Sequence, residues 1–296
     1  MLAIVIPYYK IDFFKENLDS LSNQTDKRFK VYIGNDNSKD NPEKLLLKCD
    51  FEYTYKKFET NLGGISLVKQ WERCLEMLEE EKWVMILGDD DVLGENVVEE
   101  FYKNITKVEE HNINVIRCAT IKINETAEDI SKLYKHLVIE KSTDFIFRKS
   151  RSSLSEYIFK KEKVDTIKFK DFPLAWYSDL LAVLEFSNFS NVFTINNSFV
   201  SVRVSDLSIS GMKTNTDKKW KARFKYYYYL LHYKKIFFNV EQQKRLLKLY
   251  EKSYINNKYR VYYFIKISYT HFICFGMKYY LSFINSIIKS FKIQKN

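Results

Sequence analysis

Short apolar runs alternate with segments of helical period through the first 210 residues of the chain. The candidate strands are residues 2–7, 29–34, 51–56, 82–87, 114–121 and 191–195. Candidate helices lie between them, at 11–23, 42–49, 65–79, 95–110 and 173–188. Strands that are joined by helical crossovers form a mainly parallel sheet with helices packed on its faces. The alternation therefore predicts an α/β fold.

Charge divides the chain into two parts. Residues 211–296 hold 19 lysines and arginines against 3 acidic residues, whereas the first 210 residues hold 29 against 35. The same C-terminal part carries 22 of the 49 aromatic residues. We therefore expect a domain at residues 1–210 and a basic, aromatic, helical tail at residues 211–296.

Polar residues follow four successive candidate strands. The segments are PYYK (7–10), NDNSKD (35–40), NLGG (61–64) and GDDD (88–91). Each alone could be an ordinary turn, because Asn, Asp and Gly are common turn residues. The carboxyl ends of parallel strands, however, line the crevice where α/β proteins bind ligands. Their joint occurrence predicts a binding site at this edge of the sheet.

Three consecutive carboxylates, Asp89, Asp90 and Asp91, follow the apolar strand at 82–87. Like charges at this spacing need either open water or a cation. Carboxylate oxygens are preferred ligands of Mg²⁺ and Mn²⁺, which keep substrate phosphates and waters as their other ligands. The triplet is therefore either a solvated acidic turn or a site for a cation and a diphosphate.

Taken together, these motifs resemble the family 2 glycosyltransferases with the GT-A fold, a Rossmann-like domain. IVIPYYK resembles the first strand and loop of that family, IGNDNSKD its second strand and acidic loop, NLGGISLVKQW its Asn-x-Gly segment, and LGDDDVL its DxD motif. The resemblance covers roughly residues 1–105 and becomes sparse afterwards. It implies a metal-dependent, inverting transfer of a hexose from a UDP-sugar to a hydroxyl of a glycan acceptor. Mn²⁺ or Mg²⁺ would be the cofactor, and bacterial O-antigen or capsule synthesis the setting.

The resemblance also gives roles to the residues at the strand ends. Asp91 would bind the metal directly, while Asp89 and Asp90 would face the ribose and the diphosphate. Asp36 would accept the uracil imide N–H, and a tyrosine after the first strand would contact the uracil ring. A plain turn role for Asp36 and an exposed helix position for Lys69 are the alternatives. The expected nucleotide-sugar-binding residues are Pro7, Tyr8, Tyr9, Asp36, Asn61, Gly63, Lys69, Asp89 and Asp90.

An inverting displacement needs a general base beside the acceptor hydroxyl. The segment FPLAWYSDLLAVLEF (172–186) matches the helix start at which the family carries this base, with Asp179 as the candidate. The neighbouring Trp176, on the acceptor side, would raise the pKa of this carboxyl toward the working pH. An ordinary helix-start role for Asp179 is the alternative, and Glu185 is a less favoured base.

SVRVSDLSISG (201–211) resembles the Arg-x-x-x-x-Ser-x-Ser segment of the family. Arg203 would face the acceptor or a phosphate, and a surface ion pair is the alternative. Ser208 and Ser210 would lie on a loop that closes over the donor. Ser205 stands where relatives often carry a histidine, which leaves a third metal contact open.

The tail predicts amphipathic helices at 216–235 and 240–259, where aromatic residues and leucines recur at three-to-four spacing. A last segment, from 259 to about 292, is apolar but interrupted by Lys266 and His271, among others, so it lacks a clean membrane-spanning run. Basic residues among Tyr and Phe suit an anionic membrane surface. We expect a cytoplasmic enzyme, peripheral on the inner face of the cell membrane, with a polyprenyl-diphosphate-linked acceptor. A homodimer contact is the alternative for the tail, and a nucleic-acid partner is not expected because no nucleic-acid-binding motif is present.

Two other functions compete with a transferase. A nucleotidyltransferase would carry a Gly-rich phosphate loop after its first strand, but PYYKIDFF has no glycine. A degenerate GT-A protein that serves as a membrane-associated scaffold is less expected, because Asp36, Asp89, Asp91 and Asp179 are all present. The four cysteines show no CxxC spacing, so neither zinc nor a disulfide framework is predicted.

Overall fold

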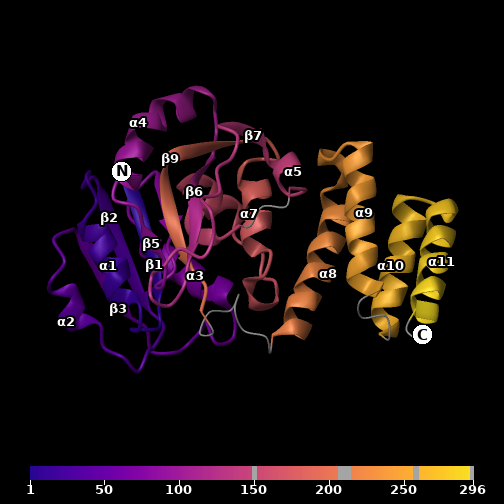
Figure 1. Ribbon diagram of the computed structural model, residues 1–296, viewed down its shortest axis with the longest axis horizontal. Helices are drawn as coiled ribbons and strands as arrows, with labels where there is room; N and C mark the ends of the chain where they lie inside the picture. Colours follow the sequence, from indigo (N-terminus) through magenta and orange to yellow (C-terminus); the bar gives the residue numbers. More distant parts are fainter. Residues whose placement is uncertain (149–151, 206–214, 256–259, 294–296) are drawn as a thin grey trace. The chain divides into compact units, whose positions relative to one another are not determined.

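The computed structural model of the protein describes residues 1–148, 152–205, 215–255 and 260–293. The chain forms two compact units (Figure 1). Unit 1 contains Met1–Asp171 and Ser178–Thr214, and unit 2 contains Phe172–Tyr177 and Asn215–Asn296. The charge boundary expected between residues 210 and 211 lies outside the described residues.

Unit 1 is built on one sheet with the strand order β3-β2-β1-β4-β8-β6-β9-β5, and β7 pairs with β9. Strands β1 to β4 run parallel to one another, as do β6 and β9, while β8 lies antiparallel between β4 and β6. The strands are β1 Leu2–Tyr8, β2 Phe29–Asn35, β3 Tyr53–Lys57, β4 Trp83–Ile86, β5 Val92–Leu93, β6 Val115–Ile123, β7 Ile139–Lys141, β8 Tyr157–Lys160 and β9 Asn191–Arg203. The predicted mainly parallel α/β sheet is confirmed.

The central strands are buried on both faces. All seven residues of β2 and all four of β4 are buried, and residues 2–6 of β1 are fully buried. This explains why their sequences are continuous apolar runs rather than alternating ones. The helices of unit 1 are α1 Phe14–Ser22, α2 Glu43–Leu46, α3 Leu67–Leu75, α4 Val97–Glu110, α5 Ser142–Phe145, α6 Lys161–Ile167 and α7 Ser178–Phe186, with the 3₁₀ turn η1 at Leu154–Glu156.

The helix expected at 173–188 is shorter than predicted. Residues Pro173–Ala175 form a separate 3₁₀ turn, η2, and α7 begins only at Ser178. Leu174 (φ 60°), Ala175 (φ 51°) and Tyr177 (φ 76°) adopt left-handed backbone conformations, which a right-handed helix cannot contain. The sequence LAWY (174–177) is apolar, but it does not continue the helix. It lies in the segment where the chain passes from unit 1 into unit 2 and back.

Unit 2 is helical, and its helices lie side by side in Figure 1. They are α8 Thr216–Tyr233, α9 Val240–Ile255, α10 Val261–Cys274 and α11 Met277–Ile293, with the 3₁₀ turn η3 at Lys235–Phe237. Rings hold α8 to its neighbours: Phe224 lies 4.5 Å from Tyr250 of α9 and 4.7 Å from Tyr263 of α10. The first two tail helices were predicted, but the last segment is a pair of helices. Within the part of the chain that the structure describes, none of the helices has the length and hydropathy of a membrane span.

Gly276 separates α10 from α11, and its φ of +85° is the reason that the last segment is not one helix. Its N–H donates to His271 O at 2.7 Å, a helix cap of the left-handed type. No atom lies within 4 Å of an added Cβ, so the cost of a side chain is only the backbone strain.

Gly276→Ala should therefore lower the free energy of unfolding by about 1 kcal/mol, measured by urea unfolding. Gly276→Asn is the matched control and should lose less, because Asn tolerates this conformation. Equal stability of all three proteins would contradict the strained turn.

Candidate functional site

The carboxyl ends of β1, β2 and β4 meet at one edge of the sheet, and hydrogen bonds tie them together. The backbone N–H groups of Tyr9 and Lys10 donate to Asp89 Oδ2 at 2.8 and 2.9 Å. The N–H of Asp36 donates to Tyr8 O at 2.9 Å. The predicted clustering of these three polar segments is therefore present, and the fourth segment joins through Asp36.

Asp36 is only 4% exposed, and its carboxylate holds the loop that follows β3. Oδ1 accepts from the N–H of Leu62 at 2.7 Å and from the Arg73 guanidinium, while Oδ2 accepts from the N–H of Gly63 at 2.9 Å. Arg73 lies 4.0 Å over the ring of Phe58. A carboxylate has about four acceptor positions, so one on Oδ2 remains after these three bonds.

Gly63 is needed at its position because the loop approaches Asp36 closely. A Cβ there would lie 2.5 Å from Asp36 Oδ2. Asn61 Oδ1 accepts from the N–H of Gly64 at 2.6 Å and shapes the same loop. Lys69, by contrast, is exposed in the first turn of α3. The structure thus brings Asn61 and Gly63 to Asp36 and leaves Lys69 on the helix surface.

The two tyrosines after Pro7 have different environments. Tyr8 is fully buried, with its ring 4.5 Å from that of Phe14, and burial raises its pKa to about 12. Tyr9 is 42% exposed. The expectation that either ring could contact a base is thus corrected, because the Tyr8 ring is part of the core. Pro7 is half-buried within β1, paired with Gly34.

Asp89 and Asp90 are half-buried, and their charges are destabilised. Burial, followed by the charge of Asp90, raises the pKa of Asp89 to about 6, although the two N–H groups that it accepts oppose the change. Burial also raises the pKa of Asp90. The amide of Asp90 and the charges of Lys10 and Arg203 oppose this rise. Among the described residues, the hydrogen bonds to the side chains of the triplet fall on Asp89 and Asp91. Asp90 therefore has the most acceptor capacity of the triplet.

Asp91 differs from its neighbours because it is 4% exposed and hydrogen-bonded on both oxygens. Oδ1 accepts from the N–H of Arg203 at 2.9 Å, and Oδ2 accepts from the Ser155 hydroxyl at 2.5 Å. Ser155 Oγ in turn accepts from the N–H of Gly88 at 3.0 Å. The amide of Asn17, fully buried on α1, donates to Gly88 O and Asp91 O at 2.9 and 2.8 Å. The buried Asp91 side chain therefore holds the turn in place through hydrogen bonds, which differs from its expected role as the direct metal ligand.

Arg203 also has a structural environment. Its side chain is fully buried and forms an ion pair with Glu16. Nε donates to Asp90 O at 3.0 Å, Nη1 donates to Asn124 O at 2.7 Å, and the guanidinium lies 4.3 Å over the ring of Phe13. The expectation that Arg203 faces an acceptor or a phosphate is therefore wrong for the arrangement seen here. The alternative, a surface ion pair, is present in part: the Glu16 side chain is exposed, but the Arg203 side chain is buried.

Asp179 lies in the first turn of α7, as predicted, and its Oδ2 accepts from the Ser152 hydroxyl at 3.1 Å. Ser152 Oγ lies 2.8 Å from the Tyr157 hydroxyl. Burial raises the pKa of Tyr157 well above its ordinary value, so this hydroxyl stays protonated and donates to Ser152. The segment 152–157 thus contacts Asp179 through Ser152 and Asp91 through Ser155.

Sequence reasoning missed this segment, because SSLSEY matches no motif and reads as a polar loop. One signal was available: Ser153 and Glu156 form a reciprocal capping box at η1, the Ser-x-x-Glu pattern of a helix start. Arg73 and Phe58 were missed as well, since nothing in the sequence pairs them with Asp36.

Some expected residues cannot be joined to this site. Trp176 belongs to unit 2, where Lys219 lies 4.8 Å over its ring, so its place beside Asp179 stays a prediction. Ser208 and Ser210 lie outside the described residues. Ser205 is 5% exposed.

The residues at the end of β4 fit a divalent cation that takes few protein ligands. A Cβ on Gly88 would lie 3.1 Å from both Asp90 Oδ1 and Asp91 Oδ2, so two carboxylates converge over a glycine. No set of three His, Cys, Asp or Glu side chains arranged for a metal occurs among the residues that the structure describes. A hard cation that keeps substrate phosphates and waters does not require such a set.

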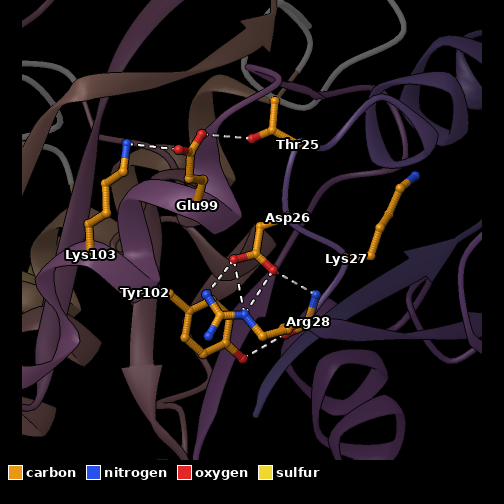
Figure 2. A pocket seen from close by; sticks show the side chains of 7 residues that line it. All are labelled: Thr25, Asp26, Lys27, Arg28, Glu99, Tyr102 and Lys103. Atoms are coloured by element: carbon orange, nitrogen blue, oxygen red, sulfur yellow. Dashed lines mark hydrogen bonds and ion pairs between the residues drawn. The ribbon is translucent and has the colours of Figure 1, made fainter.

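A hollow of about 790 Å³ occurs elsewhere in unit 1 (Figure 2). It is lined by Thr25, Asp26, Lys27, Arg28, Glu99, Tyr102 and Lys103. Arg28 directly precedes β2, so this hollow lies at the amino ends of the strands, opposite the carboxylates. Its acidic groups are paired internally, Asp26 with Arg28 and Glu99 with Lys103. We therefore do not assign it to the site.

Ser155→Ala should destabilise the site, because Asp91 Oδ2 and the N–H of Gly88 would lose a partner at a buried position. We expect the free energy of unfolding to fall by about 1 to 3 kcal/mol, measured by chemical denaturation. Ser282→Ala, at an exposed position of α11, is the matched control and should change little. Equal effects of both substitutions would contradict the role of Ser155 in holding the turn.

Comparison with known proteins places this geometry in a family. The structure of S. aureus TarS 1-349 is similar at a TM-score of 0.62 and 14% identity, covering 91% of this chain and 79% of that one. TarS 1-349 in complex with UDP-GlcNAc gives a TM-score of 0.60 and 13% identity over the same shares. No curated protein sequence matches significantly. The predicted GT-A fold is confirmed, and the profile "Glycosyl transferase family 2" matches residues 3–177, more than half of the chain. The chain belongs to glycosyl transferase family 2.

Proposed function

We propose that this protein is a metal-dependent, inverting glycosyltransferase that moves a hexose from a UDP-sugar to a hydroxyl of a glycan acceptor. The observation that carries the proposal is the collection of Asp36, Asp89 and Asp90 at the carboxyl ends of β2 and β4, the two neighbours of β1, with acceptor capacity left on Asp90. The similar fold of TarS, solved in complex with UDP-GlcNAc, supports a UDP-sugar as donor.

The uracil would bind at Asp36. The acceptor position left on Asp36 Oδ2 would take the imide N–H, next to the loop that Gly63 brings in. Tyr9, which is exposed at the end of β1, would supply the flat apolar contact for the ring. The ion pair with Arg73 would hold the Asp36 carboxylate in this position.

The cation would bind at Asp90, with Asp91 as the residue that fixes the turn. This assignment differs from the one that the resemblance implies. Both carboxylate oxygens of Asp91 already accept hydrogen bonds, whereas the Asp90 carboxylate accepts fewer from the described residues. A divalent cation, which family members typically use, supplies a Lewis acid for the charge that develops on the departing diphosphate.

Asp179 would act as the general base that takes the proton of the acceptor hydroxyl as that oxygen attacks the anomeric carbon. The bond from this carbon to the diphosphate breaks in the same displacement, which inverts the centre. Ser152, oriented by Tyr157, would hold the Asp179 carboxylate in place. The acceptor we favour is a polyprenyl-diphosphate-linked glycan in bacterial surface-polysaccharide synthesis, with the enzyme peripheral on the cytoplasmic face of the membrane.

The donor site can be tested before the acceptor is known. Thermal unfolding is measured with UDP, GDP, CDP and TDP, each with and without Mn²⁺. UDP at a hundred times its dissociation constant should add about 2.7 kcal/mol of stability, and this gain should require Mn²⁺. Absence of a response to any nucleotide would contradict the proposed donor site.

Two matched variants separate Asp90 from Asp91 in the same assay. Asp90→Asn should abolish the Mn²⁺-dependent gain and leave the free protein as stable as before, because no other described residue donates to this carboxylate. Asp91→Asn should destabilise the free protein by about 1 to 3 kcal/mol, since an amide N–H would face the Ser155 hydroxyl. If only Asp91→Asn removes the Mn²⁺ response, at unchanged stability, our metal assignment is wrong.

The base can be tested once a donor and an acceptor are found. Asp179→Asn should keep the stabilisation by UDP and Mn²⁺ but lose at least about 100-fold in turnover, measured as UDP release. Glu185→Gln, on the same helix, is the matched control and should stay active. The reverse pattern would make Glu185 the base.

A further inference from the structure

The outward side of α10 carries no charged residue. Its exposed side chains are between 46% (Phe272) and 72% (Val261) exposed, and each is aliphatic or aromatic. At 3.6 residues per turn they fall within a stripe of about 120° along one side of the helix. We call this set the α10 face; it consists of Val261, Tyr262, Ile265, Tyr269, Phe272 and Ile273.

The two residues of α10 that can carry a positive charge are not part of this face, because Lys266 is half-buried at its edge and His271 lies inside unit 2. Lys266 lies over the rings of Tyr228 and Tyr262, at 4.6 and 5.0 Å from their centroids. His271 is fully buried and bonded to Glu251 of α9 at 2.8 Å. Lys266 and His271, which interrupt the apolar sequence of this segment, therefore have their contacts within unit 2.

The apolar surface continues at the C-terminal end of α10. Lys235 of η3 donates to Cys274 O at 2.5 Å and lies 4.7 Å from the ring centroid of Phe275. The next two residues, Ile236 and Phe237, are 87% and 48% exposed. The turn between α8 and α9 thus extends the α10 face with two further exposed apolar side chains.

Helix α11 adds an amphipathic side. Met277, Leu281 and Ile288 are about half exposed and lie along one stripe of the helix, since they are four and seven residues apart. Lys278 and Lys289 are exposed on the flank of this stripe. Lysines at the edge of an apolar stripe can keep their ammonium groups in a polar layer while their stems lie along apolar material.

An apolar surface of this extent on one chain indicates a binding partner. Charge decides between the two occupants that fit, a second copy of the chain and a lipid surface. Residues 211–296 hold 19 basic and 3 acidic residues, so two copies would bring like charges together, whereas an anionic bilayer is complementary. The described helices are not membrane spans, which leaves binding in the plane of the interface.

We propose that the α10 face docks onto an anionic lipid bilayer, with α10 lying in the headgroup region and Tyr262 and Tyr269 at the polar boundary. This inference deepens the proposed function, because it names the surface that would hold the enzyme at a lipid-linked acceptor. Its test is independent of the donor site, since vesicle binding requires no nucleotide.

The experiment is flotation of the full chain with vesicles of phosphatidylcholine that contain phosphatidylglycerol, compared with vesicles of phosphatidylcholine alone. The variant Ile265→Glu with Ile273→Glu changes two residues of the α10 face that are 61% and 64% exposed. The matched control, Leu47→Glu with Leu137→Glu, makes the same kind of change at two exposed positions of unit 1.

We expect the native chain and the control to float with the anionic vesicles. The α10 variant should lose at least about tenfold in partitioning, since two apolar side chains that would be buried become charged. Flotation with phosphatidylcholine alone should be weaker. No flotation of the native chain, or equal flotation of the α10 variant, would overturn the proposal. A concentration-dependent dimer in sedimentation without vesicles, lost in the α10 variant, would overturn it in favour of a second copy.

Unchanged stabilisation of the α10 variant by UDP and Mn²⁺ would show that the donor site is intact. If the native chain responds to UDP but does not float, this inference fails while the proposed donor site stands. If it floats but does not respond to UDP, the proposed donor site fails while this inference stands.

Discussion

The hydrogen bonds on Asp91 are the constraint on which the arrangement of the site depends. Three adjacent carboxylates at the end of a buried strand would repel one another and splay apart. One of them is instead fixed inside the protein by the N–H of Arg203 and the hydroxyl of Ser155. With Asp91 fixed, Asp89 can bind the backbone after β1, and Asp90 keeps its capacity for a ligand. The hydrogen bonds on Asp91 thus leave Asp89 free to accept from the backbone after β1 and leave acceptor positions on Asp90.

The same constraint links parts of the chain that are distant in sequence. Arg203 ends β9, and its side chain reaches Glu16 of α1. Ser155 belongs to the segment that also contacts Asp179 through Ser152. A buried arginine with an ion pair and several carbonyl acceptors is costly to break, because its charge would be left uncompensated. Polar contacts therefore link these strand ends to α1 and to the segment that contains Ser155.

Much of the fold could be predicted from the sequence, because strands buried on both faces appear as continuous apolar runs. The strands Leu2–Tyr8 and Phe29–Asn35 follow such runs closely, and the helix Val97–Glu110 follows a helical spacing of its apolar residues. The antiparallel strand β8 could not be predicted, since YIFK is short and its partners are set only by tertiary structure. At the site, residue types at strand ends were predictable, but their orientation was not. Nothing in the sequence distinguishes Tyr8 in the core from Tyr9 at the surface, or says that Arg203 turns inward.

The short segment Phe172–Tyr177 has a consequence for how such a protein can be divided. It belongs to unit 2 although unit 1 precedes and follows it, so the chain crosses between the units three times. Within unit 2 its aromatic residues pack on α8, with the ring of Tyr177 4.7 Å from that of Tyr226. The helical part is therefore not a removable appendage. A cut before α8 would strip partners from the Phe172–Tyr177 segment, which lies directly before Ser178, the first residue of α7. An exchange of tails between relatives would have to carry these six residues with it, so this segment and the tail are expected to be inherited together.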